Sequence, residues 1–186
     1  ALTPPAAPDD FVALCVAALT DHKDHATLLT AWQTVVRERP NAHLYLAGEG
    51  ELEAALRAQV AALQLDAAVH FLGWREDIPD LLAAADLFVL TSHLEGLGTT
   101  LMDAQFCGLP IVATEAGGIP EVVEQGVTGI LTPPRDPGAV ARAILALAAD
   151  PDRRETMGKA GRLRAQQMFV ADRMVEQTFA VYHELL

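Results

Sequence analysis

The chain has 186 residues, of which 13 are Lys or Arg and 25 are Asp or Glu, so its formal net charge is −12. A protein that binds DNA or RNA needs a cationic surface, and this charge balance offers none overall. Apolar residues make up 51% of the chain, which excludes disorder and is enough to fill one core at this length. We therefore expect one folded domain.

The sequence also predicts the cellular compartment of the protein. The longest apolar stretch, residues 81–90, is too short for a membrane-spanning helix and is interrupted by Asp86. Cys15 and Cys107 stand far apart in apolar surroundings, which predicts reduced thiols in the core rather than a disulfide. The sequence therefore predicts a cytoplasmic protein without a membrane span.

Along the chain, short apolar runs alternate with longer amphipathic segments. The Pro-rich residues 1–10 predict a linker, and residues 11–186 the folded domain. Apolar runs predict six strands, at residues 11–19, 43–48, 69–73, 86–92, 111–115 and 128–133. Helical periodicity and composition predict helices at residues 24–39, 51–65, 78–85, 99–107, 119–125, 137–149, 151–167 and 170–186. This alternation predicts an α/β fold: a Rossmann-like, three-layer α/β/α domain with a six-stranded, mostly parallel sheet and a helical C-terminus.

Parallel sheets of this kind bind ligands beyond the carboxyl ends of their strands. The segment after the fourth predicted strand holds Gly96 and Gly98, which allow a tight turn, and Thr99 or Thr100, either of which can cap the next helix. The positive end of that helix would then face an anion such as a phosphate. The alternative is an ordinary strand–helix turn.

Two carboxylates flank this turn, because Glu95 precedes it and Asp103 lies about one turn into the helix. Ionised carboxylates accept hydrogen bonds from sugar hydroxyls, so the pair suits a hydroxyl-rich ligand. Both side chains could equally be solvated at the surface.

Other segments after strands carry weaker signals. Gly117-Gly118 opens a short helix with Pro120 in its first turn, which suggests a second helix N-terminus at the crevice or a simple glycine turn. Gly48-Glu49-Gly50 fails as a dinucleotide fingerprint, because Glu53 stands where the third glycine belongs.

Basic and aromatic residues near the predicted strand ends are also candidates. Lys23 is the only Lys or Arg in the first 36 residues and could reach a phosphate or be solvated. His22 and His25 flank it, but no further ligand completes a metal site. His93 could take part in chemistry or order its loop, and Trp74 could cover a base or lie at the edge of the core.

Taken together, these segments resemble the C-terminal, donor-binding domain of the family 4 (group 1) retaining glycosyltransferases of GT-B fold. The resemblance runs from about Phe11 to Leu186. It is most specific in three stretches, residues 95–103, 108–113 and 117–121.

The resemblance implies that the chain binds a nucleotide sugar, with a UDP, GDP or ADP moiety, and needs no metal or other cofactor. The position of Glu95 implies contact with the donor sugar, that of Asp103 with the ribose, and that of Lys23 with the diphosphate. Glu95 and Lys23 are the residues that we expect to be catalytic. The predicted donor-binding residues are Gly96, Leu97, Gly98, Thr99, Asp103, Trp74, Arg75, Gly48 and His93.

The sequence departs from the family pattern at two positions. Ala18 stands where the family has an arginine on the diphosphate, and Asp103 replaces a glutamate. These changes leave open a non-catalytic nucleotide-sugar-binding or regulatory module, and a GT-B sugar-nucleotide epimerase is a related alternative. The resemblance further implies that transfer needs an acceptor-binding N-terminal domain, which this chain lacks, and that the isolated domain is inactive.

Overall fold

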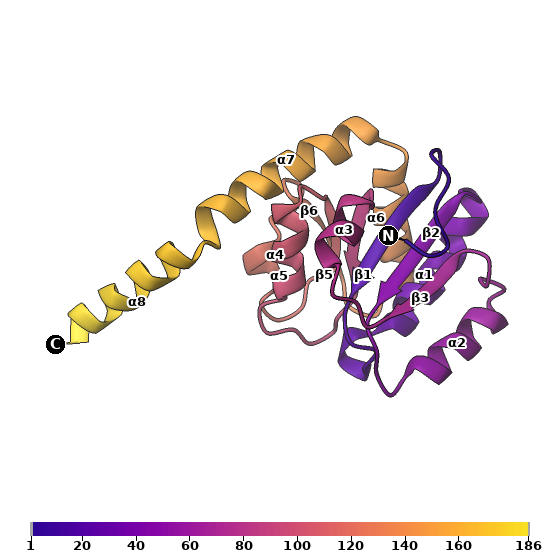
Figure 1. The fold of residues 1–186 in the computed structure, drawn as a ribbon, viewed down its shortest axis with the longest axis horizontal. Helices are drawn as coiled ribbons and strands as arrows, with labels where there is room; N and C mark the ends of the chain where they lie inside the picture. The colour runs from indigo at the N-terminus through magenta and orange to yellow at the C-terminus, as the bar shows by residue number, and fades with distance from the viewer. Residues whose placement is uncertain (1, 186) are drawn as a thin grey trace.

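The computed structural model describes residues 2–185 and contains a single six-stranded sheet (Figure 1). The strands are β1 (Phe11–Val16), β2 (Ala42–Ala47), β3 (Val69–Gly73), β4 (Leu87–Leu90), β5 (Ile111–Thr114) and β6 (Gly129–Thr132). They lie in the order β3-β2-β1-β4-β5-β6, and each adjacent pair is parallel. The predicted Rossmann-like fold is confirmed, and the mostly parallel sheet that we expected is parallel throughout.

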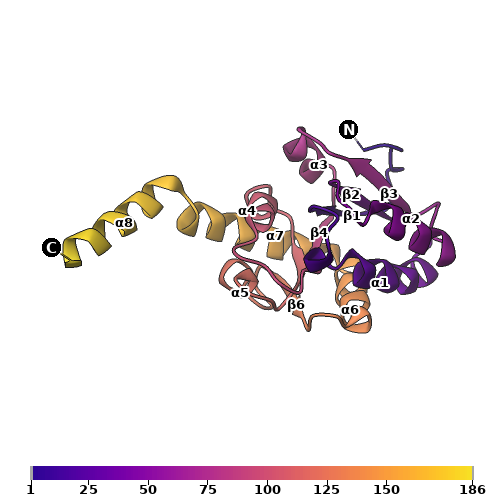
Figure 2. The same cartoon turned by 90° about the horizontal axis from the view of Figure 1, so that it is seen from below.

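Helices cover both faces of this sheet. They are η1 (Asp21–Lys23), α1 (His25–Glu38), α2 (Glu53–Ala62), α3 (Ile78–Ala83), α4 (Thr99–Phe106), α5 (Ile119–Val122), α6 (Pro137–Ala148), α7 (Pro151–Met168) and α8 (Ala171–Leu185). Figure 2 shows α3 and α4 on one side of the sheet and α1 and α6 on the other. Each face of the sheet is thereby removed from water, as the continuous apolar strands require.

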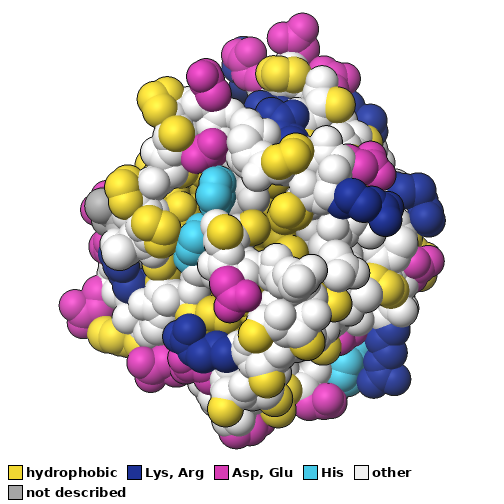
Figure 3. All heavy atoms as spheres, turned by 90° about the vertical axis from the view of Figure 1, so that its right-hand side faces the viewer, with side chains coloured by type: hydrophobic (Ala, Val, Ile, Leu, Met, Phe, Trp, Pro, Cys, Tyr) yellow, Lys and Arg dark blue, Asp and Glu magenta, His cyan; other side chains and the backbone are white. Residues whose placement is uncertain are grey.

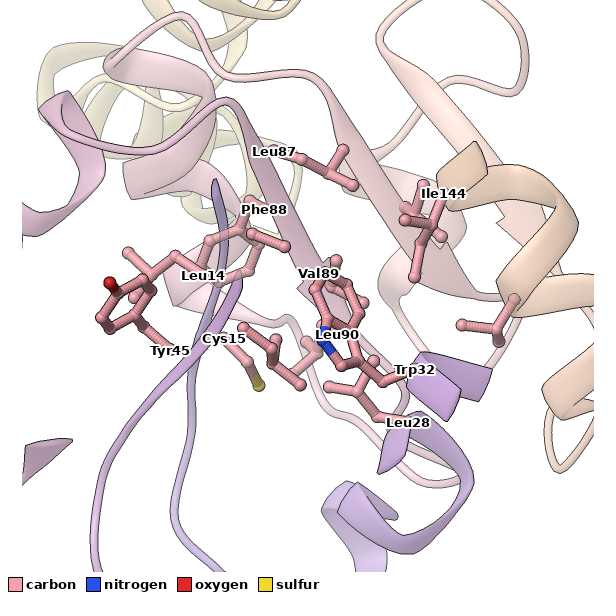
Figure 4. Packing of buried hydrophobic residues seen from close by; sticks show 14 of the residues in the cluster. Leu14, Cys15, Leu28, Trp32, Tyr45, Leu87, Phe88, Val89, Leu90 and Ile144 are labelled. Carbon is pink, nitrogen blue, oxygen red and sulfur yellow. The ribbon is translucent and has the colours of Figure 1, made fainter. Parts of the chain in front are cut away.

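The core lies between the sheet and these helices. Leu14, Phe88 and Val89 of the central strands are fully buried, and Trp32 of α1 and Ile144 of α6 pack against the sheet from one side (Figure 4). Strands β4 and β5 are buried at every position. Both faces of the central strands therefore belong to the core, and only their ends can carry functional groups.

The first strand is shorter than predicted. We expected residues 11–19, but β1 ends at Val16, and residues 17–19 run against the turn that follows β2. A Cβ on Gly48 would lie 2.0 Å from the carbonyl oxygen of Ala17, and one on Gly50 would lie 2.4 Å from that of Leu19. The backbones touch there because neither glycine has a side chain, and this contact bends residues 17–19 out of the strand.

The prediction of two core thiols is half wrong. Cys15 is buried in β1, and burial raises its pKa to about 12. Cys107 is exposed, at the C-cap position that follows the last turn of α4. Both cysteines are free thiols.

The first residues of the chain lie on the domain. The hydroxyl of Tyr45 donates a hydrogen bond of 2.8 Å to the carbonyl of Pro4, and Leu2 and Ala6 pack on the core. A linker at residues 1–10 stays a prediction.

The last helix projects from the domain. Figure 1 shows α7 passing over the sheet layers and α8 continuing away from them. Val175, Phe179 and Tyr182 of α8 are exposed. No helix in the described part of the chain combines the length and apolar character needed to cross a membrane.

On one face of the molecule the acidic side chains are dispersed among other residues. On the face that Figure 3 presents, Asp and Glu alternate with scattered Lys and Arg around a more apolar middle. The net charge of −12 is thus spread and not gathered into a single cluster on this face.

Helix α7 docks through a backbone contact, which allows a test of the fold. A Cβ on Gly158 would lie 2.0 Å from the carbonyl oxygen of Gly108, so we expect Gly158→Ala to force α7 outward and lower the free energy of unfolding by about 1–3 kcal/mol. Lys159→Ala, at the next and exposed position of α7, should change it by less than about 0.5 kcal/mol. Urea denaturation measures both, and equal effects of the two substitutions would contradict the docking contact.

Candidate functional site

The order of the strands creates a crevice at the carboxyl edge of the sheet. The chain moves outward from β1 to β2 and β3, then returns to the other side of β1 with β4. The connections after β1 and β4 therefore diverge to opposite faces, which leaves a gap between them. Lys23 follows β1 and Glu95 follows β4, so both lie at this gap.

An ion pair joins these two residues. The Nζ atom of Lys23 lies 2.5 Å from Oε2 of Glu95, although the residues are 72 positions apart in the chain. The two side chains are only 17% and 12% exposed. Because they are mostly buried, water screens their attraction less than it would at an open surface.

The end of β4 holds both partners in place. The hydroxyl of Thr91 lies 3.2 Å from the carbonyl oxygen of Lys23 and 3.0 Å from that of Asp24, and donates to both. The hydroxyl of Ser92 donates to Oε2 of Glu95 over 3.1 Å. Both hydroxyl residues are buried. Neither residue could be singled out from the sequence, because serine and threonine after a strand are common and only the folded geometry shows what they contact.

A second pair of glycines packs closely against the backbone of the Glu95 loop. A Cβ on Gly117 would lie 1.9 Å from the carbonyl oxygen of Glu95, and a Cβ on Gly118 would lie 1.9 Å from that of Gly96. The N–H of Gly118 donates to the Glu95 carbonyl over 3.1 Å. The residues that open α5, for which the sequence left open an anion site or a simple glycine turn, thus contact the loop that carries Glu95.

Helix α4 begins differently from the prediction. Neither Thr99 nor Thr100 caps it, because the N-cap is Gly98, with φ of 66° and no side-chain hydrogen bond. The chain must turn sharply out of the Glu95 loop, and glycine adopts this left-handed conformation without strain. Gly96, Leu97 and Thr99 are exposed around this helix start, where the first backbone N–H groups lack helical partners.

A hollow of about 330 Å³ lies at the same edge of the sheet, at the ends of β1, β2 and β3. Its lining includes the small residues Ala17, Ala18 and Gly48, and Thr100 from the first turn of α4. Trp74 and Arg75, which follow β3, form another part of the wall. The structure thereby brings three of the predicted donor-binding residues, Gly48, Trp74 and Arg75, to one hollow.

Carboxylates contact both residues of this wall, Arg75 through its side chain and Trp74 through its backbone. Two nitrogens of Arg75 donate to the two carboxylate oxygens of Asp77 over 2.7 and 2.6 Å, and the guanidinium holds the pKa of that carboxyl well below its usual range. The backbone N–H of Trp74 donates to Oε1 of Glu49 over 3.3 Å. The indole of Trp74 is 65% exposed, so it is a surface residue and not a core-edge aromatic.

Six of the predicted donor-binding residues neither line the hollow nor belong to the ion pair: Gly96, Leu97, Gly98, Thr99, His93 and Asp103. The Nε2 atom of His93 lies 3.3 Å from a carboxylate oxygen of Asp21, and its backbone N–H donates to the carbonyl of His22. This arrangement ties the Glu95 loop to η1. Asp103 is an exposed residue of α4, one turn beyond Thr100, and partial burial raises the pKa of its carboxyl.

A neutral pair is buried beneath Lys23. The Sγ atom of Cys15 lies 3.7 Å from Nε2 of His25, and His25 is 3% exposed. Burial, reinforced by the nearby Lys23 charge, lowers the pKa of His25 to about 4. Among the described residues, no three His, Cys, Asp or Glu side chains are grouped so that they could hold a metal ion.

Comparison with known proteins identifies the family. Residues 4–164 match the glycosyl transferases group 1. The chain belongs to this family. The glycosyltransferase domain is 33% identical over 159 residues to N-acetyl-alpha-D-glucosaminyl L-malate synthase of Bacillus anthracis, over 86% of this chain and 42% of that enzyme. It is 35% identical to the GDP-mannose-dependent monoacylated alpha-(1-6)-phosphatidylinositol monomannoside mannosyltransferase of Corynebacterium glutamicum, over 83% of this chain and 42% of that enzyme.

Solved glycosyltransferase structures share the fold. Anabaena Alr3699/HepE, in complex with UDP-glucose, matches with a TM-score of 0.87 and 33% identity over 96% of this chain and 50% of that one. The C-terminal domain of LpcC, a group 1 family protein of Francisella tularensis, matches in fold with a TM-score of 0.79 at 21% identity, over 86% of this chain and 87% of that one. The expected family and fold are confirmed. The glycosyltransferase domain spans 50% of the HepE chain and 42% of each of the two enzymes above.

The buried His25 makes the stability of the glycosyltransferase domain depend on pH. The folded-state pKa of about 4 lies below the unfolded value of 6.5, so the unfolded chain binds the extra proton first as the pH falls. We expect the free energy of unfolding to be constant with respect to this group above pH 6.5 and to drop by about 3 kcal/mol between pH 6.5 and 4.

Urea denaturation at several pH values measures this drop, with His25→Gln as the comparison because glutamine does not titrate. The wild type should lose more stability than the variant across that range. Parallel curves for the two proteins would show that the imidazole does not titrate as described.

Proposed function

We propose that this chain is the donor-binding domain of a retaining, metal-independent glycosyltransferase that transfers a sugar from a nucleoside diphosphate sugar to an acceptor. The observation that carries the proposal is the ion pair of Lys23 and Glu95 at the crevice between β1 and β4. A cation and a carboxylate at one point match the two parts of such a donor, an anionic diphosphate and a sugar rich in hydroxyls.

The surroundings of the ion pair suit the rest of the donor. A hollow of about 330 Å³ is within the usual range for a small-molecule pocket, and the exposed indole of Trp74 offers a flat apolar surface to a base. The backbone N–H groups at the start of α4, next to Gly98 and Thr99, suit the phosphates. The donor would thus lie with its base at Trp74 and Arg75 and its sugar at Glu95.

Catalysis in this proposal is electrostatic. When the bond between the sugar and the diphosphate breaks, negative charge accumulates on the departing phosphate. Lys23 and the positive end of α4 stabilise that charge from fixed positions, so we propose that no metal is required. Glu95 accepts hydrogen bonds from the sugar and holds it in place for attack.

We further propose that transfer requires an acceptor-binding domain in the same protein, and that this chain alone binds the donor without turning it over. The length of the relatives supports this, because the chain spans 42% of each of the two enzymes compared above. Relatives named for GDP-mannose and for a UDP-glucose complex support GDP and UDP as candidate nucleotides, and ADP is the third candidate that the family resemblance implies. The free thiols Cys15 and Cys107 suit the reducing cytoplasm.

A non-catalytic nucleotide-sugar-binding module is the second candidate. Ala18 leaves the hollow without the arginine that the family pattern carries, and the exposed Asp103 does not line the hollow. Both features would weaken a donor site without removing it.

Donor binding can be tested on the chain itself. Titration of UDP-glucose, GDP-mannose and ADP-glucose by calorimetry should give binding with at least one donor at near-millimolar concentrations. Lys23→Met should weaken that binding roughly tenfold or more, because a charge-assisted contact to phosphate is lost. Lys159→Met removes an exposed ammonium of α7 and should leave it unchanged. Absence of heat with all three donors would refute the proposed function.

Turnover separates the two candidate functions. In the protein that includes an acceptor-binding domain, Glu95→Ala should lower the rate of sugar transfer by a factor of 10² or more, because the sugar loses its orienting carboxylate. A scaffold would keep its partner with this substitution. Sugar transfer at the wild-type rate by the Glu95→Ala variant would contradict the enzymatic role.

A further inference from the structure

The ammonium of Lys23, the proposed diphosphate ligand, already has an anionic partner in the protein. Oε2 of Glu95 accepts hydrogen bonds from Nζ of Lys23 at 2.5 Å and from the Ser92 hydroxyl at 3.1 Å. Ser92 is buried and cannot follow the carboxylate into solvent. The carboxylate of Glu95 is therefore held at the cation by a second, buried donor to the same oxygen.

A phosphate that approaches Lys23 meets this carboxylate. The ammonium has three N–H groups and could contact both anions, but a phosphate oxygen and a carboxylate oxygen on one ammonium lie close together and repel each other. Because the pair is mostly buried, solvent weakens this repulsion only in part. Glu95 consequently opposes the binding of any phosphate that gives its carboxylate no new partner.

We propose that Glu95 makes the site select an intact nucleotide sugar over the bare nucleoside diphosphate. This inference rests on the proposed function. The sugar of the donor brings hydroxyls that donate to the Glu95 carboxylate, so that Lys23 is released to the diphosphate and neither charge is left unpaired. The nucleoside diphosphate brings the phosphates without these hydroxyls. It must break the ion pair between Lys23 and Glu95 and leave the carboxylate without a new partner.

The same exchange drives the product out. After the sugar has left, the carboxylate of Glu95 has no hydroxyl donors and competes again for Lys23. The ion pair reforms in the position that Ser92 and Thr91 hold ready, and the nucleoside diphosphate loses its ammonium contact. Glu95 thus favours binding of the donor by accepting hydrogen bonds from its sugar, and it weakens binding of the product by competing for Lys23.

The experiment compares Glu95→Gln with the wild type by calorimetry, using pyrophosphate, UDP and GDP, and the matching donors UDP-glucose and GDP-mannose. Glutamine keeps the size of the side chain but carries no charge. We expect the variant to bind pyrophosphate and the recognised nucleoside diphosphate roughly tenfold more tightly than the wild type does. The affinity for the donor should increase less than the affinity for the diphosphate, so that the preference for donor over diphosphate falls.

Asp21→Asn is the matched control, because it also removes one negative charge. Asp21 belongs to η1 with Lys23, its carboxylate is 90% exposed, and its described partner is His93 and not Lys23. It should change the affinity for pyrophosphate less than twofold. Glu95→Ala, checked for its fold by circular dichroism, should tighten diphosphate binding in the same direction as Glu95→Gln.

Three results would overturn the inference. If the wild type binds a nucleotide sugar but Glu95→Gln binds the diphosphate no more tightly, the inference is wrong while the proposed function stands. If Asp21→Asn tightens binding as much as Glu95→Gln, net charge and not the ion pair is responsible. If the wild type binds no nucleotide at all, the inference and the proposed function fail together.

Discussion

The parallel pairing of β1 with β4 is the constraint on which the site depends. Ala13 lies opposite Leu87 and Leu14 opposite Phe88, which fixes the carboxyl ends of two strands side by side although α1, β2, α2, β3 and α3 separate them in the chain. The loops that leave these ends hold Lys23 and Glu95. An ion pair between residues so distant in sequence follows from this register, because a shift of the strands would carry the two loops apart.

Backbone contacts between glycines and neighbouring loops make that edge rigid. Gly48 and Gly50 lie against residues 17–19, and Gly117 and Gly118 lie against the carbonyls of the Glu95 loop. A contact of backbone with backbone leaves no side chain that could change its rotamer to adapt. The edge is therefore pre-organised, and the groups proposed to stabilise a departing diphosphate need little reorganisation.

Most of the fold could be predicted from the sequence, because apolar runs and helical periodicity follow directly from burial. The ends of elements could not, since a contact with another loop ended β1 at Val16 and a sharp turn moved the cap of α4 to Gly98. Within the candidate site, strand order was enough to bring Lys23 and Glu95 to one edge. Their pairing, the hydroxyls of Thr91 and Ser92, and the outward position of Cys107 depend on side-chain directions that a linear pattern does not contain.

The negative net charge of the domain affects how an anionic ligand would arrive. With a net charge of −12 the domain repels a diphosphate at a distance, and attraction begins only within reach of Lys23 and the start of α4. Dissolved ions screen the long-range repulsion more than they screen a mostly buried ammonium. Raising the ionic strength would therefore speed the encounter of the two molecules, the reverse of the usual behaviour of a cationic phosphate-binding protein.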